Sequence, residues 1–98
     1  MFPKWYRPKR YTVKDIAQII SAEWGVTPED IFGGSRDVEF VMARAALVVR
    51  LRKQGYSYPR IGRILKRDHT TIMNAERKAQ IWRERDPDFD HLCRMVLA

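Results

Sequence analysis

Hydrophobic residues recur at helical spacing over most of the 98-residue chain. The first apolar face follows the spacing i, i+3, i+4, i+7, i+11 and consists of Val13, Ile16, Ala17, Ile20 and Trp24. Thr12 and Asp15 at its start form a capping-box-like pair, and Gly25 marks its end. No stretch shows the sustained alternation of apolar and polar residues that is typical of strands. The pattern therefore predicts an all-α fold.

Three further helices follow from similar signals. Thr27-Pro28 opens a short helix, which Gly33-Gly34 ends. A longer helix is predicted from residue 39 to residue 54, with an inward face made of Phe40, Ala43, Leu47 and Leu51. Ser57-Tyr58-Pro59 opens another short helix over residues 58–65.

The helix that begins after Asp68 has two distinct faces. Its apolar face consists of Ile72, Ala75, Ala79 and Trp82, and its opposite face of Thr70, Met73, Asn74 and Arg77. Asp68 is a favoured N-cap residue. A short helix, a tight turn and a second helix with polar leading residues form the layout of a helix-turn-helix, whose second helix enters the major groove of DNA.

The distribution of charge favours a polyanionic partner. The net charge is +7, and residues 40–67 contain eight Lys and Arg residues without any Asp or Glu. Residues 1–10 add four more bases, again without an acid. Unopposed Lys and Arg create a local positive field, which attracts nucleic acid. A merely solvated basic face and an anionic membrane surface are the alternatives.

Composition narrows the class of protein. A hydrophobic share of 45%, with three Trp, four Tyr and four Phe, is typical of a globular domain. The single cysteine, Cys93, cannot form an internal disulfide, which fits a reducing compartment. No apolar run reaches the length of a membrane span, and the N-terminus lacks the apolar core of a signal peptide. We therefore expect a cytoplasmic, nucleoid-associated protein, and a monomer because no heptad pattern or exposed apolar helix is evident.

The run Asp68-His69-Thr70-Thr71 admits several interpretations. Catalysis is disfavoured, because adjacent Asp and His side chains at a helix start do not face each other and no nucleophile motif occurs. A metal site is disfavoured because His91 and Cys93 lack spaced partners. An N-cap followed by ordinary polar surface is the structural alternative. Reading of DNA bases fits the chemistry, since carboxylate, imidazole, threonine methyl and amide groups can all meet base edges. We therefore predict no enzyme activity, no metal and no cofactor.

The sequence RDHTTIMNAERK at residues 67–78 closely resembles the signature of the C-terminal DNA-binding domain, domain IV, of the bacterial replication initiator DnaA. Residues 31–36, IFGGSR, are similar to the start of that family's basic loop, and residues 57–62, SYPRIG, to the start of a family helix. The resemblance covers roughly residues 11–98 and leaves residues 1–10 as a basic N-terminal arm. It implies a compact multi-helix domain of the DnaA domain IV, Trp-repressor-like type.

The resemblance also implies roles for individual residues. Asp68, His69 and Thr70 match the residues that read bases in the major groove, and Asn74 stands where a histidine often stands. Arg36 matches an arginine that enters the minor groove. For Arg67, Thr71, Arg52, Arg44, Tyr58 and Pro59 the resemblance implies contacts to the DNA backbone, or support for them. The charge of Arg60, Arg63 and Lys66, rather than the resemblance, leads us to expect further backbone contacts from these three residues.

Two segments depart from the family pattern. The family's loop is dense in basic residues, whereas Gly34, Asp37, Val38 and Glu39 leave Arg36 nearly alone. Residues 63–66 provide four residues between Gly62 and Arg67, where the family usually has five ending in Gly-Gly. These departures shorten the predicted turn and reduce the charge of the loop.

Two functions remain open from the sequence. No Walker A motif occurs, so we expect no nucleotide binding and a free-standing domain. The favoured function is sequence-specific binding of double-stranded DNA at a DnaA-box-like site, regulating replication initiation or transcription without ATPase activity. The alternative is a protein–protein adaptor of the replication machinery that keeps the fold but has lost DnaA-box recognition.

Overall fold

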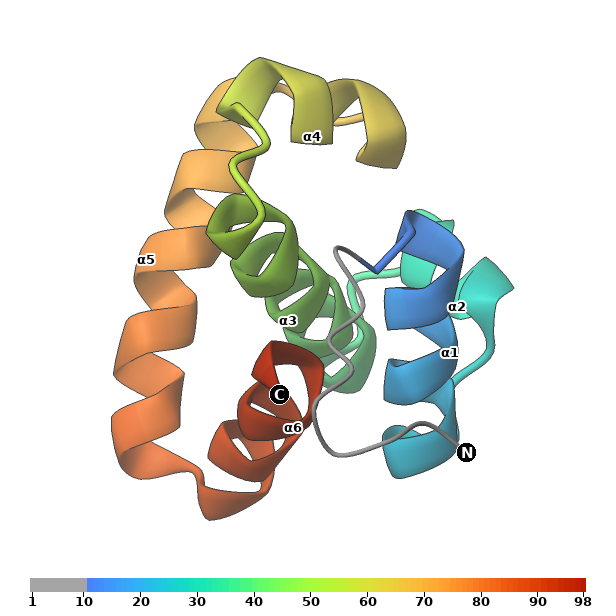
Figure 1. Ribbon diagram of the computed structural model, residues 1–98, viewed down its shortest axis with the longest axis vertical. Coiled ribbons are helices and arrows are strands. Elements are labelled where there is room, and N and C mark those ends of the chain that lie inside the picture. Colours follow the sequence, from blue (N-terminus) through green and yellow to red (C-terminus); the bar gives the residue numbers. More distant parts are fainter. Residues whose placement is uncertain (1–10) are drawn as a thin grey trace, which may run out of the picture.

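The computed structural model describes residues 11–98, so the predicted basic arm at residues 1–10 lies outside the described residues. Those residues form helices and no strand, which confirms the all-α prediction (Figure 1). In chain order the helices are α1 Val13–Trp24, α2 Pro28–Phe32, α3 Val38–Lys53, α4 Tyr58–Leu65, α5 His69–Arg85 and α6 Pro87–Leu97. None of these helices is long and apolar enough to cross a membrane.

Threonine–aspartate pairs begin both α1 and α2. The Asp15 amide donates to Thr12 Oγ1 at 3.1 Å, and the Thr12 amide donates to Asp15 Oδ2 at 3.1 Å. Thr27 and Asp30 repeat this arrangement at 3.1 and 3.0 Å. Each pair satisfies backbone N–H groups that the first turn of a helix leaves without partners. The predicted start of each helix is thus confirmed, and so is the end of α1 at Gly25, which has a φ of 69°.

The helix α3 lies at the centre of the molecule and contacts every other helix (Figure 1). Its buried apolar residues are Met42, Ala43, Ala45, Ala46, Leu47, Val48 and Leu51. The sequence predicted one inward face, whereas neighbours cover α3 on several sides. Arg44 and Arg50 lie outside the predicted inward face, yet both are buried in the structure.

Aromatic residues join α6 to α1 and α5. Phe89 in α6 has no exposed surface. Its ring lies edge-to-face against Trp82 of α5, with ring centroids 5.7 Å apart, and against Trp24 of α1 at 6.2 Å. Such pairs add to the stabilisation that burial of large apolar surfaces gives. This cluster fixes the end of the molecule farthest along α5 from the helix-turn-helix (Figure 1).

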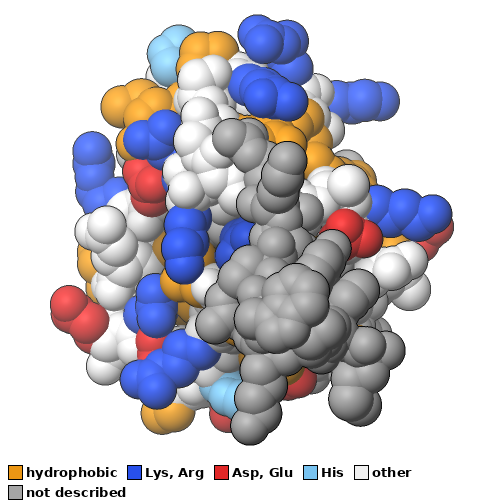
Figure 2. Space-filling model, viewed as in Figure 1, with side chains coloured by type: hydrophobic (Ala, Val, Ile, Leu, Met, Phe, Trp, Pro, Cys, Tyr) orange, Lys and Arg blue, Asp and Glu red, His pale blue; other side chains and the backbone are white. Residues whose placement is uncertain are grey.

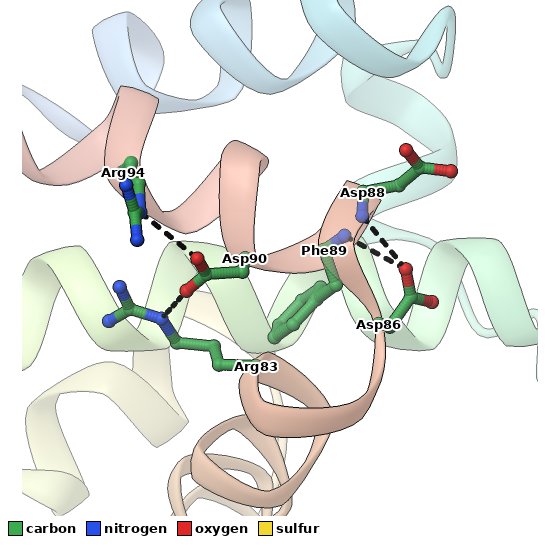
Figure 3. Close-up of polar contacts among 6 residues, drawn as sticks. All are labelled: Arg83, Asp86, Asp88, Phe89, Asp90 and Arg94. Carbon is green, nitrogen blue, oxygen red and sulfur yellow. Dashed lines mark hydrogen bonds and ion pairs between the residues drawn. The ribbon is translucent and has the colours of Figure 1, made fainter.

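Carboxylates stabilise the corner between α5 and α6 (Figure 3). Asp86 Oδ1 accepts hydrogen bonds from the amides of Asp88 and Phe89 at 3.0 and 3.1 Å, and so caps α6. Asp90 accepts from Arg83 Nε at 2.7 Å and from Arg94 Nε at 3.0 Å. The hydrogen bond from Arg83 holds the pKa of Asp90 below its usual value, although partial burial acts in the opposite direction. Charge is therefore neutralised locally at this corner.

Candidate nucleic-acid interface

The helices α4 and α5 form a helix-turn-helix with a very tight turn (Figure 1). A Cβ atom added to Gly62 would lie 2.5 Å from the carbonyl oxygen of Arg67. The Arg67 amide donates to the Gly62 carbonyl at 2.8 Å. Lys66 ends α4 in the left-handed conformation, with a φ of 55°, a position that most often holds glycine. The four-residue link between Gly62 and Arg67 therefore closes by placing a lysine in a conformation that favours glycine.

The Arg67 side chain holds this turn against the rest of the domain. Its Nη1 donates to the carbonyl of Leu65 at 2.6 Å, and its Nη2 donates to the carbonyl of Gly33 at 2.6 Å. Gly33 lies at the end of α2, far from the turn in sequence. Arg67 thus supports the position of the turn and of the start of α5 by tying them to the end of α2.

The N-terminal edge of α5 presents polar side chains to solvent. Asp68, His69, Thr70, Thr71 and Asn74 are all exposed. Asp68 occupies the N-cap position, as predicted, but its side chain makes no capping hydrogen bond. Asp68 Oδ1 instead lies 3.0 Å from His69 Nδ1, so the expectation that these adjacent side chains do not face each other is wrong. The predicted base readers therefore share one exposed edge, while Ile72 on the other face is buried.

Met73 is a residue that the sequence analysis placed on this outer face without giving it a role. The structure leaves 38% of it exposed, beside the predicted base readers Thr70 and Asn74. A large apolar side chain on an otherwise polar edge can pack against a thymine methyl group. Its spacing of three residues from Thr70 was the signal that could have identified it.

Glu76 joins the scaffold helix α3 to both helices of the helix-turn-helix. Its Oε2 accepts from Arg52 Nε at 3.3 Å, and its Oε1 accepts from the Tyr58 hydroxyl at 2.5 Å. The guanidinium of Arg52 lies 4.0 Å above the centre of the Tyr58 ring, within cation–π distance. The hydrogen bond to Glu76 raises the pKa of Tyr58, because the phenol loses this bond when it ionises. Sequence reasoning did not single out Glu76, since its partners lie 24 and 18 residues away.

Basic residues lie along α4 and at its C-terminal end. Arg60, Arg63 and Lys66 are exposed, as is Pro59. The Arg60 guanidinium stacks on Tyr56, 3.9 Å from the ring centre. Figure 2 shows Lys and Arg side chains gathered over the end of the molecule that α4 forms, where no Asp or Glu side chain is visible in this view. This basic surface adjoins the polar edge of α5.

The two arginines predicted near the loop lie in different environments. Arg36 is exposed in the segment between α2 and α3. Arg44 is only 8% exposed, and it donates to the carbonyls of Ile31 at 2.7 Å and Asp30 at 3.3 Å. Burial, followed by the nearby positive charge of Arg67, lowers the pKa of Arg44. Arg44 therefore holds α2 against α3, which differs from the predicted phosphate contact.

Comparison with protein families identifies the same region. The family model described as the bacterial dnaA protein helix-turn-helix matches residues 13–79. The match includes the basic helix α4, the turn and the polar edge of α5.

Curated proteins with similar sequences are chromosomal replication initiators. DnaA 1 of Chlamydia muridarum is 34% identical over 86 residues, which cover 86% of this chain and 19% of that protein. DnaA 2 of Chlamydia caviae is 36% identical over 69 residues, or 69% of this chain and 15% of that protein. DnaA of Deinococcus radiodurans is 32% identical over 75 residues, or 76% of this chain and 16% of that protein. The chain thus spans a fifth or less of the length of these relatives. It belongs to the bacterial DnaA helix-turn-helix family, a family of DNA-binding domains.

Proposed function

We propose that this domain binds double-stranded DNA sequence-specifically, with the start of α5 in the major groove of a DnaA-box-like site. The observation that carries the proposal is the polar edge of α5. Within the described part of the chain, the side chains of Asp68, His69, Thr70 and Asn74 make no polar contact except the one between Asp68 and His69. These groups are not used to hold the fold, so they are available to base edges.

Each proposed base reader has a matching chemistry. The Asp68 carboxylate accepts from a cytosine amino group, the Thr70 methyl group packs on a thymine methyl, and Asn74 pairs with adenine. The contact with His69 orients both Asp68 and the imidazole before DNA binds. A reading edge ordered in advance loses less entropy on binding.

Contacts to the DNA backbone are proposed for the residues around the edge. Arg60, Arg63 and Lys66 would meet phosphates from α4 and the turn, together with Tyr58, Pro59, Arg52 and Thr71. Arg36 would reach the minor groove from the loop. Arg67 would act by positioning the turn, because its side chain already binds two carbonyls. Arg44 is buried and therefore is not among the proposed DNA contacts.

We further propose that the domain acts in the cytoplasm, in association with the nucleoid, and regulates replication initiation or transcription without ATPase activity. The support is that the matched relatives are chromosomal replication initiators and that the matched region includes their helix-turn-helix. Replication proteins as further partners, and a monomeric state, belong to the same proposal.

Selection of bound sequences from a random duplex pool tests the proposal directly. Once a preferred duplex is known, His69→Ala should cost about 1–3 kcal/mol on that duplex and little on unrelated DNA. Arg63→Gln should instead weaken binding to all duplexes alike and reduce the log–log salt slope by about one unit. Arg85→Gln removes the same charge from the exposed far end of α5 and serves as the matched control.

The adaptor alternative makes the opposite prediction. A protein that had lost DNA recognition would enrich no sequence from the pool, and any residual affinity would come from charge alone. Equal losses on preferred and unrelated duplexes after His69→Ala would also contradict base reading by this residue.

A further inference from the structure

A pocket of about 480 Å³ lies between α3 and α5, beside the loop that follows α2. A smaller hollow of about 180 Å³ continues it along α5, and the two share Val41, Thr71, Ala75 and Lys78 as lining residues. We refer to the larger hollow as the α3–α5 pocket. Its volume falls in the range that small-molecule sites occupy.

The floor of the α3–α5 pocket is apolar. Val48 and Leu65 line it and are buried, and Ile72 of α5 adds a third buried apolar side chain. These residues come from α3, α4 and α5, so all three helices shape the floor. An apolar floor of this kind suits a ring or a short aliphatic chain better than a bare inorganic ion.

The charges that line the pocket are all positive. Arg36, Arg44, Arg67 and Lys78 contribute to it, and no described residue among the lining is an acid. The hydrogen bonds that the Arg44 and Arg67 side chains donate all go to backbone carbonyl oxygens. A carbonyl carries only a partial negative charge, so the two guanidiniums are hydrogen-bonded without being neutralised.

Burial makes this unbalanced charge costly. Arg44 is 8% exposed, and both burial and the charge of Arg67 lower its pKa. Buried charges are normally paired with an opposite charge. An anion placed at the mouth of the pocket would supply that opposite charge, with the exposed Arg36 and Lys78 as its first contacts.

We propose that the α3–α5 pocket binds a small organic anion, with its apolar ring or chain on the floor and its anionic head at the cationic mouth. The proposal goes beyond DNA binding, since the site is a hollow among three helices and has an apolar floor. A phosphate group of DNA could reach the mouth, but it has no apolar part to cover Val48 and Leu65.

A bound anion would also affect DNA binding, a consequence that rests on the proposed function. The pocket is lined by Arg36 and Thr71, both of which are proposed DNA contacts. Negative charge held between them would repel a phosphate and occupy the same donors. DNA affinity should therefore fall as the ligand saturates.

Titration of the full chain with naphthoate, followed by backbone amide NMR in the absence of DNA, tests the proposal. We expect saturable shifts at pocket residues such as Ser35, Val48 and Ala75. Naphthamide, which has the same shape without the charge, should bind at least about ten-fold more weakly than naphthoate. Equal binding of both compounds would overturn the proposed role of the cations. Equal shifts with inorganic phosphate would show that the site binds phosphate without help from the apolar floor, and would overturn the proposal of an organic ligand.

Two variants locate the site within the fold. Val41→Phe places a larger side chain in the wall and should abolish the naphthoate shifts. Lys78→Gln changes only an exposed side chain and should weaken naphthoate about two- to five-fold. Lys14→Gln removes the same charge from the exposed surface of α1 and should change nothing.

The outcomes separate this proposal from the proposed function. Binding of naphthoate that survives both pocket variants unchanged would place the ligand elsewhere and overturn the inference. Because these titrations contain no DNA, their result does not depend on whether the domain recognises a specific DNA sequence. Failure of the DNA selection with intact naphthoate binding would refute the proposed function alone.

Discussion

The helix α5 has a corner at each end, and the two corners are built from different interactions. At its start, Gly62 and Arg67 bring the backbones of α4 and α5 into contact, and Lys66 takes a left-handed conformation. At its end, Asp86 caps α6 with its side chain, and Asp90 accepts from two arginines. Each corner has an aspartate at a helix N-cap, Asp68 and Asp86, but only Asp86 makes capping hydrogen bonds.

This difference separates polar groups that hold the fold from polar groups that remain available. The α5–α6 corner uses the carboxylates of Asp86 and Asp90 within the domain. The α4–α5 corner is closed by backbone contacts and by Arg67, which leaves Asp68 and His69 exposed. A helix-turn-helix needs this arrangement because base recognition requires side chains that the fold does not occupy.

The largest expected effect comes from closing the space at the α4–α5 corner. Gly62→Ala places a Cβ atom 2.5 Å from a backbone oxygen, and neither backbone can move without displacing a helix. We expect a loss of about 2–3 kcal/mol in the free energy of unfolding, measured by urea denaturation. Gly34→Ala is the control, because a Cβ atom there has no neighbour within 4 Å. Equal midpoints for the two variants would show that the corner is not tightly packed.

The two N-cap aspartates provide the sharpest test of the comparison. Asp86→Ala removes two hydrogen bonds to the first turn of α6 and should cost about 1 kcal/mol of stability, with DNA affinity unchanged. Asp68→Ala removes no capping bond, so stability should change by less than about 0.5 kcal/mol. Affinity for the preferred duplex should fall by about 1–3 kcal/mol instead. Urea denaturation and fluorescence anisotropy with labelled duplex measure the two quantities.

The opposite pattern would reverse the proposed roles. If Asp68→Ala lowered stability as Asp86→Ala does, the Asp68 carboxylate would act as a cap of α5 and not as a free base reader. Affinity for unrelated DNA is a further check. It should stay constant or rise after Asp68→Ala, because a negative charge is removed from the DNA-facing edge.

Much of the fold could be predicted from local sequence signals. Capping pairs such as Thr12 with Asp15, and the spacing of apolar residues, identify helices because they act within a few residues. The burial of Arg44 could not be predicted in this way. Its partners, the carbonyls of Asp30 and Ile31, come from a helix packed against α3, and a sequence pattern contains no information on that packing.

The candidate site was predictable to a similar extent. The exposed edge from Asp68 to Asn74 follows from helical spacing and from the family resemblance. The support beneath it does not, since Glu76 joins Arg52 and Tyr58 across three helices. The commitment of Arg67 to two carbonyls was also beyond sequence reasoning, because Gly33 lies 34 residues away.

A smaller effect is expected at Lys66, where stability and DNA binding should change in opposite directions. Lys66→Gly relieves the left-handed conformation and should stabilise the domain by about 1 kcal/mol. It also removes a proposed phosphate contact, so the log–log salt slope of DNA binding should decrease by about one unit. Lys66→Gln separates the two effects, since it loses the charge and keeps the strain. A stability gain from Lys66→Gln equal to that from Lys66→Gly would contradict the conformational explanation.

The smallest effect concerns the carboxylate of the α5–α6 corner and depends on pH. Arg83 and Arg94 hold the pKa of folded Asp90 below its unfolded value of about 3.9. The stabilisation from Asp90 is therefore fully present above that unfolded value and is lost as the pH falls through the lower folded pKa. Asp90→Asn should be less stable than the wild type at pH 6, and the difference should shrink as the pH falls below about 4. Urea denaturation across this range measures it. A difference that stays constant with pH would show that the pairing of Asp90 with arginine contributes nothing to stability through ionisation.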